Sequence, residues 1–447
     1  MTIRQKLYLD IDGVLITAKN PKAADYVGEF IDYILSRYDV YWLTTHCDSD
    51  ASAAIDYLKD YLPLYYLDKL KTVKPTQWDT LKTEAIDFSS DFIWLDDYAM
   101  QAERNFLATK SKLNNLIIVN LNNESELKRI IKLLDADRIK GCIFGQAIGD
   151  ALGLGTEFMS AEEVRHHYPD GLSDYSQIIQ DKHRRRFIKG RWTDDTDMML
   201  CVLYGIRNFG EIDVQQVAVN FKAWAEGLPM GIGRHTYEVL SLWDYLQDPF
   251  KAAEIIWELS GRESAANGGI MRTCAVGLLK ENVSEYAEKV CRLTHPDPRC
   301  VKSCILISEL ISSLIWKGAE LEYDDMVSVA ENDVEFIHYL SKAKECDDIS
   351  QLELDDLKSM GYTYKTMSAA LWALWHCSSF EEGLLTVVNA GGDADTNAAV
   401  ACCELGAKYG FSTIPEKYVQ GLYASDLLDK ISDMVTNGLL AYEVWAD

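Results

Sequence analysis

The spacing of apolar residues changes once along the chain, near residue 135, and this change limits the possible folds. Up to about residue 134, short apolar runs alternate with amphipathic stretches, which predicts a parallel sheet with right-handed crossover connections. Helical patterns such as 23–36 and 124–134 lie between the runs. The predicted strands span residues 7–9, 40–43, 64–67, 92–95 and 116–119.

Beyond about residue 136 the strand pattern fades, and long helical patterns replace it. These patterns span residues 198–208, 214–226, 301–316, 326–342, 367–377 and 397–408. We therefore predict a multidomain chain, with a Rossmann-like α/β domain at 1–135 and an all-α domain at 136–447. No Pro/Gly/Ser-rich linker separates the two, so the junction is predicted to be short.

The charge balance excludes some classes of partner. Lys and Arg number 44 against 70 Asp and Glu, a net charge of −26, which argues against binding to nucleic acid or to an anionic membrane. The eleven cysteines form no CxxC pair, which is typical of reduced thiols. The chain has neither a signal-peptide core at its start nor an apolar run of about 18 residues. We expect a cytoplasmic protein.

Polar residues stand at or near the ends of the predicted strands. The carboxyl ends of parallel strands form the ligand-binding edge of a sheet, so position adds to residue type. Asp10 is suited to attack phosphorus, and Asp12 to act as acid and base. The other members of the set are Thr44 or Thr45, then Lys74 to hold charge, and Asp96 or Asp97 to bind Mg²⁺.

This ordered set resembles the motifs of the haloacid dehalogenase-like superfamily, over residues 1 to about 134. The resemblance implies a phosphatase, because Asp12 is present, with Thr44 and Lys74 at the substrate and one Mg²⁺ at Asp96 and Asp97. The loop after the first strand is short for a large cap, which leaves the site open to bulky phosphoesters. In the alternative, the domain serves packing or regulation, and these residues form turns, caps and a salt bridge.

Acidic residues crowd the start of a predicted helix in "GRWTDDTDMML", residues 190–200. Thr193 can cap this helix, and the helix dipole favours one or two carboxylates in its first turn. Capping does not explain why the device recurs in "NAGGDADTNAAVA", where Asp393 and Asp395 follow paired glycines and Thr396 opens a second helix. Two such helix starts that face each other would offer oxygen ligands to a hard cation, Mg²⁺ or Mn²⁺.

Five motifs, "GDALGLGTEF", "GRWTDDTDMML", "ANGGIMR", "THPDP" and "GGDADTNAAVA", occur in this order within the helical half. Together they resemble the ADP-ribosylglycohydrolase family, typified by the dinitrogenase reductase-activating glycohydrolase, over residues 139 to 440. The resemblance implies two Mg²⁺ or Mn²⁺ ions that hold the ribose hydroxyls while water cleaves the bond at the anomeric carbon. It implies as metal ligands Thr193, Asp194, Asp195, Asp393, Asp395 and Thr396.

The same resemblance implies further residues of the site. Glu157 would be an acidic residue beside the metals that assists water or the leaving group in catalysis, and its alternative is a solvated or salt-bridged acid. Asn267, Gly268 and Gly269 precede a helical run and would bind a pyrophosphate through backbone amides, unless they form a plain turn. His295 would lie near the phosphates. We interpret the basic run "KHRRRF", residues 182–187, as a solvated loop, and the alternative is that it contacts a phosphate or an acidic target.

The sequence thus predicts an ADP-ribosylglycohydrolase with a phosphatase-like first domain. Its substrate would be an ADP-ribosylated protein or a small ADP-ribosyl molecule, and the linkage that it cleaves stays open. The alternative is an ADP-ribose-binding module whose only chemistry lies in the first domain.

Overall fold

The structure is a computed structural model that describes residues 4–441. Its internal contacts divide the chain into two compact units. The first unit extends to Asp137 and includes Lys317–Ala319, and the second comprises Arg138–Trp316 and the chain from Glu320 onward. Helix α5 (Glu126–Gly153) is continuous across this boundary, so the chain passes from one unit to the other without a loop.

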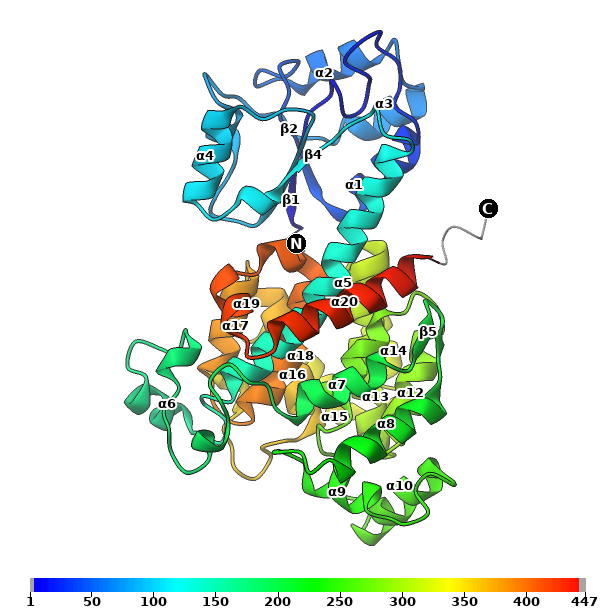
Figure 1. Ribbon diagram of the computed structural model, residues 1–447, viewed down its shortest axis with the longest axis vertical. Coiled ribbons are helices and arrows are strands. Elements are labelled where there is room, and N and C mark those ends of the chain that lie inside the picture. The colour runs from blue at the N-terminus through cyan, green and yellow to red at the C-terminus, as the bar shows by residue number, and fades with distance from the viewer. Residues whose placement is uncertain (1–3, 442–447) are drawn as a thin grey trace. The chain divides into compact units, whose positions relative to one another are not determined.

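The first unit contains a small parallel sheet (Figure 1). Its strand order is β2-β1-β3-β4, and β1 pairs in register with both of its neighbours. Alternate residues of β1 point to opposite faces of the sheet, so Leu7 and Leu9 belong to one buried apolar cluster and Tyr8 belongs to another. The strands are β1 (Lys6–Leu9), β2 (Asp39–Trp42), β3 (Phe92–Asp96) and β4 (Leu116–Ile118).

One predicted strand is wrong, because residues 64–67 belong to a helix. The helices of the first unit are α1 (Val27–Arg37), α2 (Ala51–Leu58), α3 (Leu64–Leu70) and α4 (Gln101–Thr109). Leu67 and Leu70 are buried on one face of α3, whereas Leu64 and Tyr65 are exposed. A short apolar run does not distinguish strand from helix by its periodicity, and Pro63 at the helix start favours the helix here.

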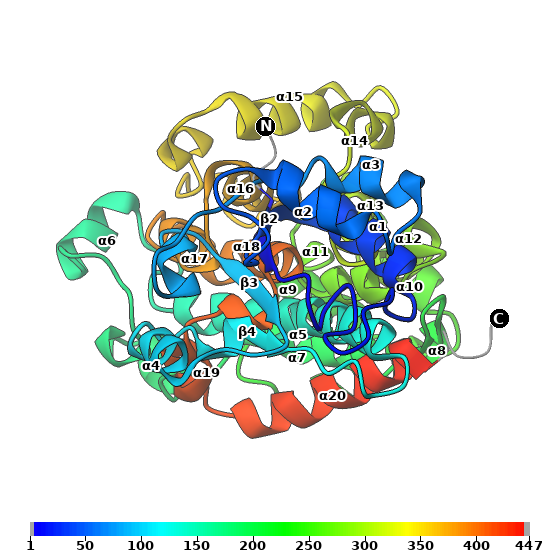
Figure 2. The same ribbon diagram turned by 90° about the horizontal axis from the view of Figure 1, so that it is seen from above.

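The second unit is helical, as predicted. Helix α18 lies at its centre, packed against α16 and α17 (Figure 2). Its helices after α5 are α6 (Ala161–His167), α7 (Asp194–Leu203), α8 (Val214–Glu226), α9 (Arg234–Leu240), α10 (Pro249–Leu259), α11 (Ile270–Thr273), α12 (Val283–Arg292), α13 (Pro298–Ser312), α14 (Tyr323–Val329), α15 (Val334–Glu345), α16 (Thr363–His376), α17 (Phe380–Val388), α18 (Ala394–Tyr409), α19 (Glu416–Gly421) and α20 (Ser425–Ala441).

Two helical predictions in this unit need correction. The pattern at 326–342 is two helices, because Glu331 and Asn332 have positive φ and Asp333 caps α15 by accepting from the backbone N–H of Phe336. The pattern at 198–208 ends early, because the chain turns at Gly210 into a hairpin of β5 (Ile206–Asn208) and β6 (Glu211–Ile212). None of the helices in the described residues has the length and apolar character needed to cross a bilayer.

A row of glycines lets α5 approach α18 closely. Gly141, Gly145, Gly149 and Gly153 recur at every fourth position, so they lie on one face of α5. A β-carbon at Gly149 would come within 2.2 Å of the carbonyl oxygen of Ala398, and the other three glycines meet α18 backbone at similar distances. This packing fixes α5 against the helix that begins at Ala394.

We predict that Gly149→Ala lowers the free energy of unfolding by about 1 to 3 kcal/mol, because the added methyl group must displace backbone. Gly438→Ala in α20 is the matched control, since nothing lies within 4 Å of the point where its β-carbon would stand. There alanine should stabilise by up to about 1 kcal/mol through helix propensity. Urea denaturation followed by far-UV circular dichroism measures both, and equal effects would contradict the close-packing account.

Candidate active site

Two helix starts in the second unit carry the crowded acids. Thr193 is the N-cap of α7, so Asp194 and Asp195 occupy its first turn. Asp393 is the N-cap of α18, so Asp395 lies in the first turn of that helix. These positions favour negative charge because they lie at the positive end of each helix dipole.

The carboxylates of the two helix starts form two linked groups. Oxygen atoms of Asp150, Asp195 and Asp395 lie within 4.8 Å of one another, and so do those of Glu157, Asp393 and Asp395. Asp395 belongs to both groups. Asp195 from α7 therefore meets Asp395 from α18, whereas the predicted ligand Asp194 belongs to neither group and lines the cavity beside them. Asp150 from α5 joins the first group, although the sequence did not indicate it as a ligand.

The pKa values of these acids rise because the carboxylates are buried and close to one another. Burial, and then the charge of Asp150, raises the pKa of Asp195 well above its ordinary value. Burial, and then the charge of Glu157, does the same to the pKa of Asp395. Burial raises the pKa of Asp194 to about 6 and that of Asp393 to about 6. The ionised cluster is therefore unfavourable without a compensating cation.

The donor set fits Mg²⁺ or Mn²⁺. It consists of carboxylate and hydroxyl oxygens, without Cys or His among the acids that cluster. The Oδ1 atom of Asp195 is buried and has no hydrogen-bond partner among the described residues, so it is available as a ligand. Thr193 donates its hydroxyl to Asp195 Oδ2 at 3.0 Å, and Thr396 is buried beside the same acid.

Two acids hold the local structure, Asp150 within the cluster and Asp197 outside it. Asp150 is fully buried and accepts hydrogen bonds from the backbone N–H groups of Thr193 and Thr196 and from the Thr196 hydroxyl, at 2.6–3.0 Å. It thereby fixes the first turn of α7. Asp197, the third acid of the motif, accepts from the indole N–H groups of Trp192 and Trp224 at 2.8 and 3.1 Å. Its carboxylate is thus occupied outside the two acidic groups.

A cavity of about 490 Å³ opens over the cluster, a size suited to a small-molecule ligand. Asn267, Gly268 and His295 line it together with the acids. The amide Nδ2 of Asn267 donates to Asp393 Oδ2 at 2.7 Å, so this residue orients an acid as well as facing the cavity. Helix α11, which follows, has only four residues and is weaker support for anion binding than predicted.

Gly269, unlike Asn267 and Gly268, is not among the residues that line the cavity, and its Cα faces the protein core. A β-carbon there would come within 3.0 Å of Cys291 Sγ, whereas one at Gly268 would meet the His295 ring at 2.8 Å. Gly268 therefore lets the imidazole reach the cavity wall. Burial lowers the pKa of His295 well below its usual value, and its Nδ1 lies 2.7 Å from the Thr294 hydroxyl. This histidine is neutral.

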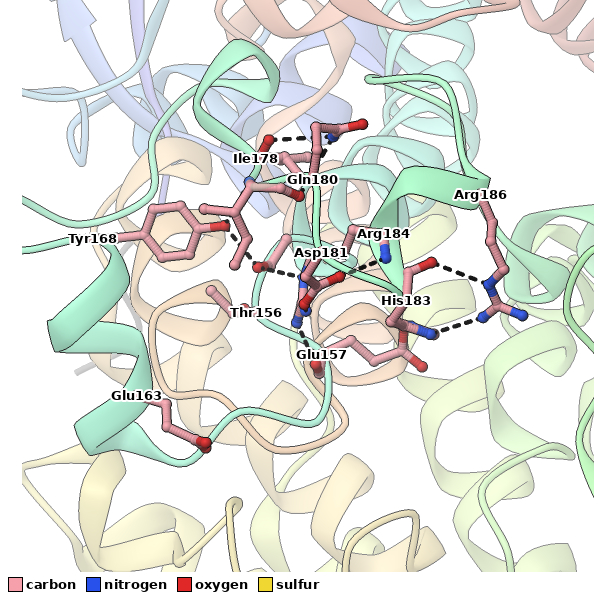
Figure 3. Close-up of polar contacts among 12 residues, drawn as sticks. Thr156, Glu157, Glu163, Tyr168, Ile178, Gln180, Asp181, His183, Arg184 and Arg186 are labelled. Atoms are coloured by element: carbon pink, nitrogen blue, oxygen red, sulfur yellow. Dashed lines mark hydrogen bonds and ion pairs between the residues drawn. The ribbon is translucent and has the colours of Figure 1, made fainter.

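The basic run at 182–187 is only in part the solvated loop that we predicted, because Lys182, Arg185 and Arg186 are exposed and the rest is not (Figure 3). Arg184 is buried, and its guanidinium donates to the backbone carbonyls of Gly155 and Glu157. His183 Nε2 lies 2.6 Å from Glu157 Oε2, and both side chains line the cavity. The sequence shows only that these residues are basic. It does not indicate these contacts, because they depend on the tertiary fold.

The first unit has an acidic cluster of its own. Oxygen atoms of Asp10, Asp96 and Asp97, at the carboxyl ends of β1 and β3, lie within 4.8 Å of one another. Burial, and then the charge of Asp10, raises the pKa of Asp96 to about 7. Gly13, at φ +74°, leaves room for Asp97, since a β-carbon there would lie 2.4 Å from the Asp97 carboxyl.

Lys82 rather than Lys74 supplies the positive charge of this cluster. Its ammonium group donates to Asp10 at 2.7 Å and to Asp96 at 2.6 Å. Lys74 instead donates to Asp39, the first residue of β2 and hence at the opposite end of the sheet. The sequence did not indicate Lys82, because it begins a short 3-10 turn outside any periodic segment.

Asp12 has neighbours that suit an acid and base. His46 Nε2 lies 2.7 Å from its Oδ2, and the Tyr57 hydroxyl donates to its Oδ1 at 3.0 Å. The rings of His46 and Tyr57 stack at 3.7 Å. Thr44 is buried at the end of β2, and Thr45 is exposed.

Comparison with known proteins agrees with the geometry of the second unit. The model of the ADP-ribosylglycohydrolase family matches residues 132–444, and the chain therefore belongs to the ADP-ribosylglycohydrolase family. The chain is 26% identical over 310 residues to the ADP-ribosylarginine hydrolase Tri1 of Serratia proteamaculans (strain 568), covering 67% of this chain and 79% of that relative. It is 29% identical over 308 residues to the ADP-ribosylarginine hydrolase Tri1 of Pseudomonas putida (strain GB-1), covering 66% and 77%.

Two further likenesses cover a similar share of the chain. The ADP-ribosylhydrolase ARH3 of Danio rerio is 25% identical over 319 residues, covering 62% of this chain and 84% of the relative. A solved structure titled ADP-ribosylglycohydrolase-related protein complex superposes with a TM-score of 0.54 at 22% identity, covering 68% of this chain and 98% of that one. At this identity the structural likeness supports the fold alone.

We predict that Mn²⁺ or Mg²⁺ stabilises the protein against heat, by about 2.7 kcal/mol at 100 times the dissociation constant. Asp395→Asn should reduce this gain and should raise the melting temperature in EDTA, because it removes a buried charge among like charges. Asp170→Asn is the control, since Asp170 is exposed. Thermal melting with EDTA and with each metal tests this; a metal gain in Asp395→Asn as large as in the wild type would disprove the shared site.

Proposed function

We propose that the protein is a metal-dependent hydrolase that cleaves the glycosidic bond at the anomeric carbon of ADP-ribosyl groups. The observation that carries the proposal is the pair of carboxylate groups that share Asp395, from the start of α18, at the cavity. Family membership and relatives named for hydrolysis of ADP-ribosyl linkages support it.

The proposed metal ligands are the residues that the resemblance implied, with Asp150 beside them. Mg²⁺ or Mn²⁺ bound here would act as a Lewis acid toward the oxygen atoms of the substrate. The proposed ligands are Thr193, Asp194, Asp195, Asp393, Asp395 and Thr396. The Oδ1 atom of buried Asp195, which has no hydrogen-bond partner among the described residues, supports this set.

Other residues at the cavity would have roles in catalysis and in substrate binding. Glu157 would take a proton from the water that attacks the anomeric carbon, through its Oε1, since Oε2 already contacts His183. Neutral His295 and the backbone at Gly268 would contact the diphosphate by hydrogen bonds. Asn267 holds Asp393, so that the acid keeps its place in the cluster.

The leaving group is the less defined part of the proposal. The first relatives are named for ADP-ribosylarginine, which makes an arginine linkage on a protein or a small molecule the first to test. A serine linkage, another side chain, a nucleic-acid base and a small molecule remain open. Binding of ADP-ribose without turnover is the competing function.

We further propose that the first unit is a haloacid dehalogenase-like phosphatase. The supporting observation is the meeting of Asp10, Asp96, Asp97 and Lys82 at the carboxyl edge of the sheet. Asp10 would attack phosphorus, with Lys82 offsetting the charge and Mg²⁺ bound by Asp96 and Asp97. Asp12 would transfer the proton to the leaving group. A phosphorylated ADP-ribose derivative or related nucleotide would connect both units to one pathway.

The proposed hydrolase predicts that purified protein releases free ADP-ribose from at least one of an Arg-linked, a Ser-linked and a small-molecule substrate when Mg²⁺ or Mn²⁺ is present. EDTA and Asp194→Ala should each reduce the rate at least about 100-fold, because the metal ligands are lost. Asp170→Ala is the matched control, an exposed acid away from the cavity lining. Chromatography of released ADP-ribose measures the rate. Tight binding of ADP-ribose with no release from any substrate would favour the binding module.

The proposed phosphatase predicts Mg²⁺-dependent release of inorganic phosphate from a broad phosphoester panel. Asp10→Asn and Lys82→Met should each abolish it, whereas Lys74→Met should leave it unchanged, because Lys74 is bonded to Asp39. The two lysine variants remove the same charge from one unit and so control for each other. Absence of phosphate release from the whole panel would count against this activity, and equal loss in both lysine variants would contradict the assignment of Lys82.

A further inference from the structure

Residues 181–187 are tied to the turn that carries Glu157. Arg184 is held by the carboxylate of Asp181 and donates through Nε to the Gly155 carbonyl at 2.9 Å and through Nη2 to the Glu157 carbonyl. The backbone N–H of Phe158 donates to the Gly392 carbonyl at 2.7 Å, just before α18 begins. The backbone on both sides of Glu157 is thus fixed.

The contacts of His183 define its protonation. Its Nδ1 lies 2.7 Å from Arg186 Nη2, and a guanidinium can only donate a hydrogen bond. Nδ1 therefore accepts, and the ring proton is on Nε2. Nε2 in turn donates to Glu157 Oε2 at 2.6 Å (Figure 3). Arg186 thus selects the tautomer that binds the carboxylate.

The imidazole ring is held by packing as well as by hydrogen bonds. The Phe158 ring lies 5.4 Å from it and the Phe187 ring 6.2 Å, measured between centroids. Phe158 has a φ of +61°, a left-handed conformation that is rare for an aromatic residue. This strained residue directly follows Glu157, at a functional position where such strain is commonly found.

Glu157 needs such a restraint because like charges surround it. Its carboxylate lies within 4.8 Å of oxygen atoms of Asp393 and Asp395. The side chain has three rotatable bonds, so repulsion from those acids would turn it away if nothing held it. The hydrogen bond from His183 holds Oε2 and leaves Oε1 for the reaction.

We propose that His183 is a positioning residue for Glu157, and that Arg186 fixes the tautomer by which it acts. The proposal rests on the proposed hydrolase function, which it extends to two residues outside the metal ligand set. His183 takes no part in metal binding and is not required to touch the substrate.

The first test compares His183→Ala with His183→Gln under saturating Mn²⁺, on whichever ADP-ribosyl substrate the wild type cleaves. We expect His183→Ala to lower kcat roughly 10- to 100-fold, with KM and the affinity for free ADP-ribose within about twofold of wild type. His183→Gln should recover much of the loss, since its amide N–H can donate to Glu157. A kcat for His183→Ala equal to that of wild type would overturn the proposal.

A second variant tests the tautomer without touching the Glu157 contact. Arg186→Met should lower kcat several-fold, whereas Arg185→Ala should not, because Arg185 is exposed and forms no side-chain hydrogen bond or ion pair with the described residues. Both variants lose one positive charge from the same loop, so a general charge effect would lower both rates alike and would overturn the role of Arg186.

A double-mutant cycle with Glu157→Gln separates positioning from folding. If His183 acts through Glu157, then adding His183→Ala to Glu157→Gln should cause little further loss of kcat. A further loss as large as in the single variant would show a merely structural role and would overturn the proposal. A wild type that releases no ADP-ribose from any substrate would refute the hydrolase function itself, whereas an active wild type with an unaffected His183→Ala would refute only the positioning role.

Discussion

The close contact between α5 and α18 is the constraint on which the second unit depends. Glycines at every fourth position of α5 bring the two helix backbones to a distance that no side chain would permit. Asp150 lies on α5 between two of these glycines, and Asp395 lies in the first turn of α18. Asp150 and Asp395 are far apart in the sequence. The glycine contact therefore determines where these two carboxylates of the cluster meet.

The resulting acidic cluster is unfavourable for the stability of the fold, and the same feature makes it suitable as a cation-binding site. Burial and mutual charge raise the pKa of Asp195 and of Asp395, so the fold bears a cost that a cation relieves. Asp197, which lies outside both acidic groups, is satisfied by contrast, because two indole N–H groups donate to it. Within the cluster, burial raises the pKa of Asp150 to about 7 although it accepts hydrogen bonds from the first turn of α7. The carboxylates whose charge is not compensated lie where a ligand would bind.

The sequence was sufficient for the residues that lie at the ends of regular elements. Asp10 and Asp96 were predictable because a strand end has a fixed place in a parallel sheet, and Asp195 and Asp395 because a helix start has a distinct composition. The meeting of α7 with α18 rested on family resemblance. The glycine spacing was visible in the sequence, but its partner helix was not.

The residues that the sequence did not indicate lie in irregular segments. Lys82 begins a 3-10 turn and His183 precedes another. Neither segment has a periodic sequence pattern that shows which way its side chains point. Lys74 was predicted from its place in the order of the motifs, and only the fold shows that Lys82 reaches Asp10 and that Lys74 does not. The residues at 64–67 were ambiguous for a related reason, since a short apolar run suits either kind of element.

The sharing of Asp395 has a thermodynamic consequence. Because Asp395 belongs to both acidic groups, a cation in one group and a cation in the other would both be attracted by its negative charge. Each cation would also reduce the repulsion among the acids of the other group. Occupancy at the two positions is then linked, and by reciprocity each alters the affinity of the other by the same factor. Binding isotherms for such a centre carry a coupling free energy, and they do not reduce to two independent constants.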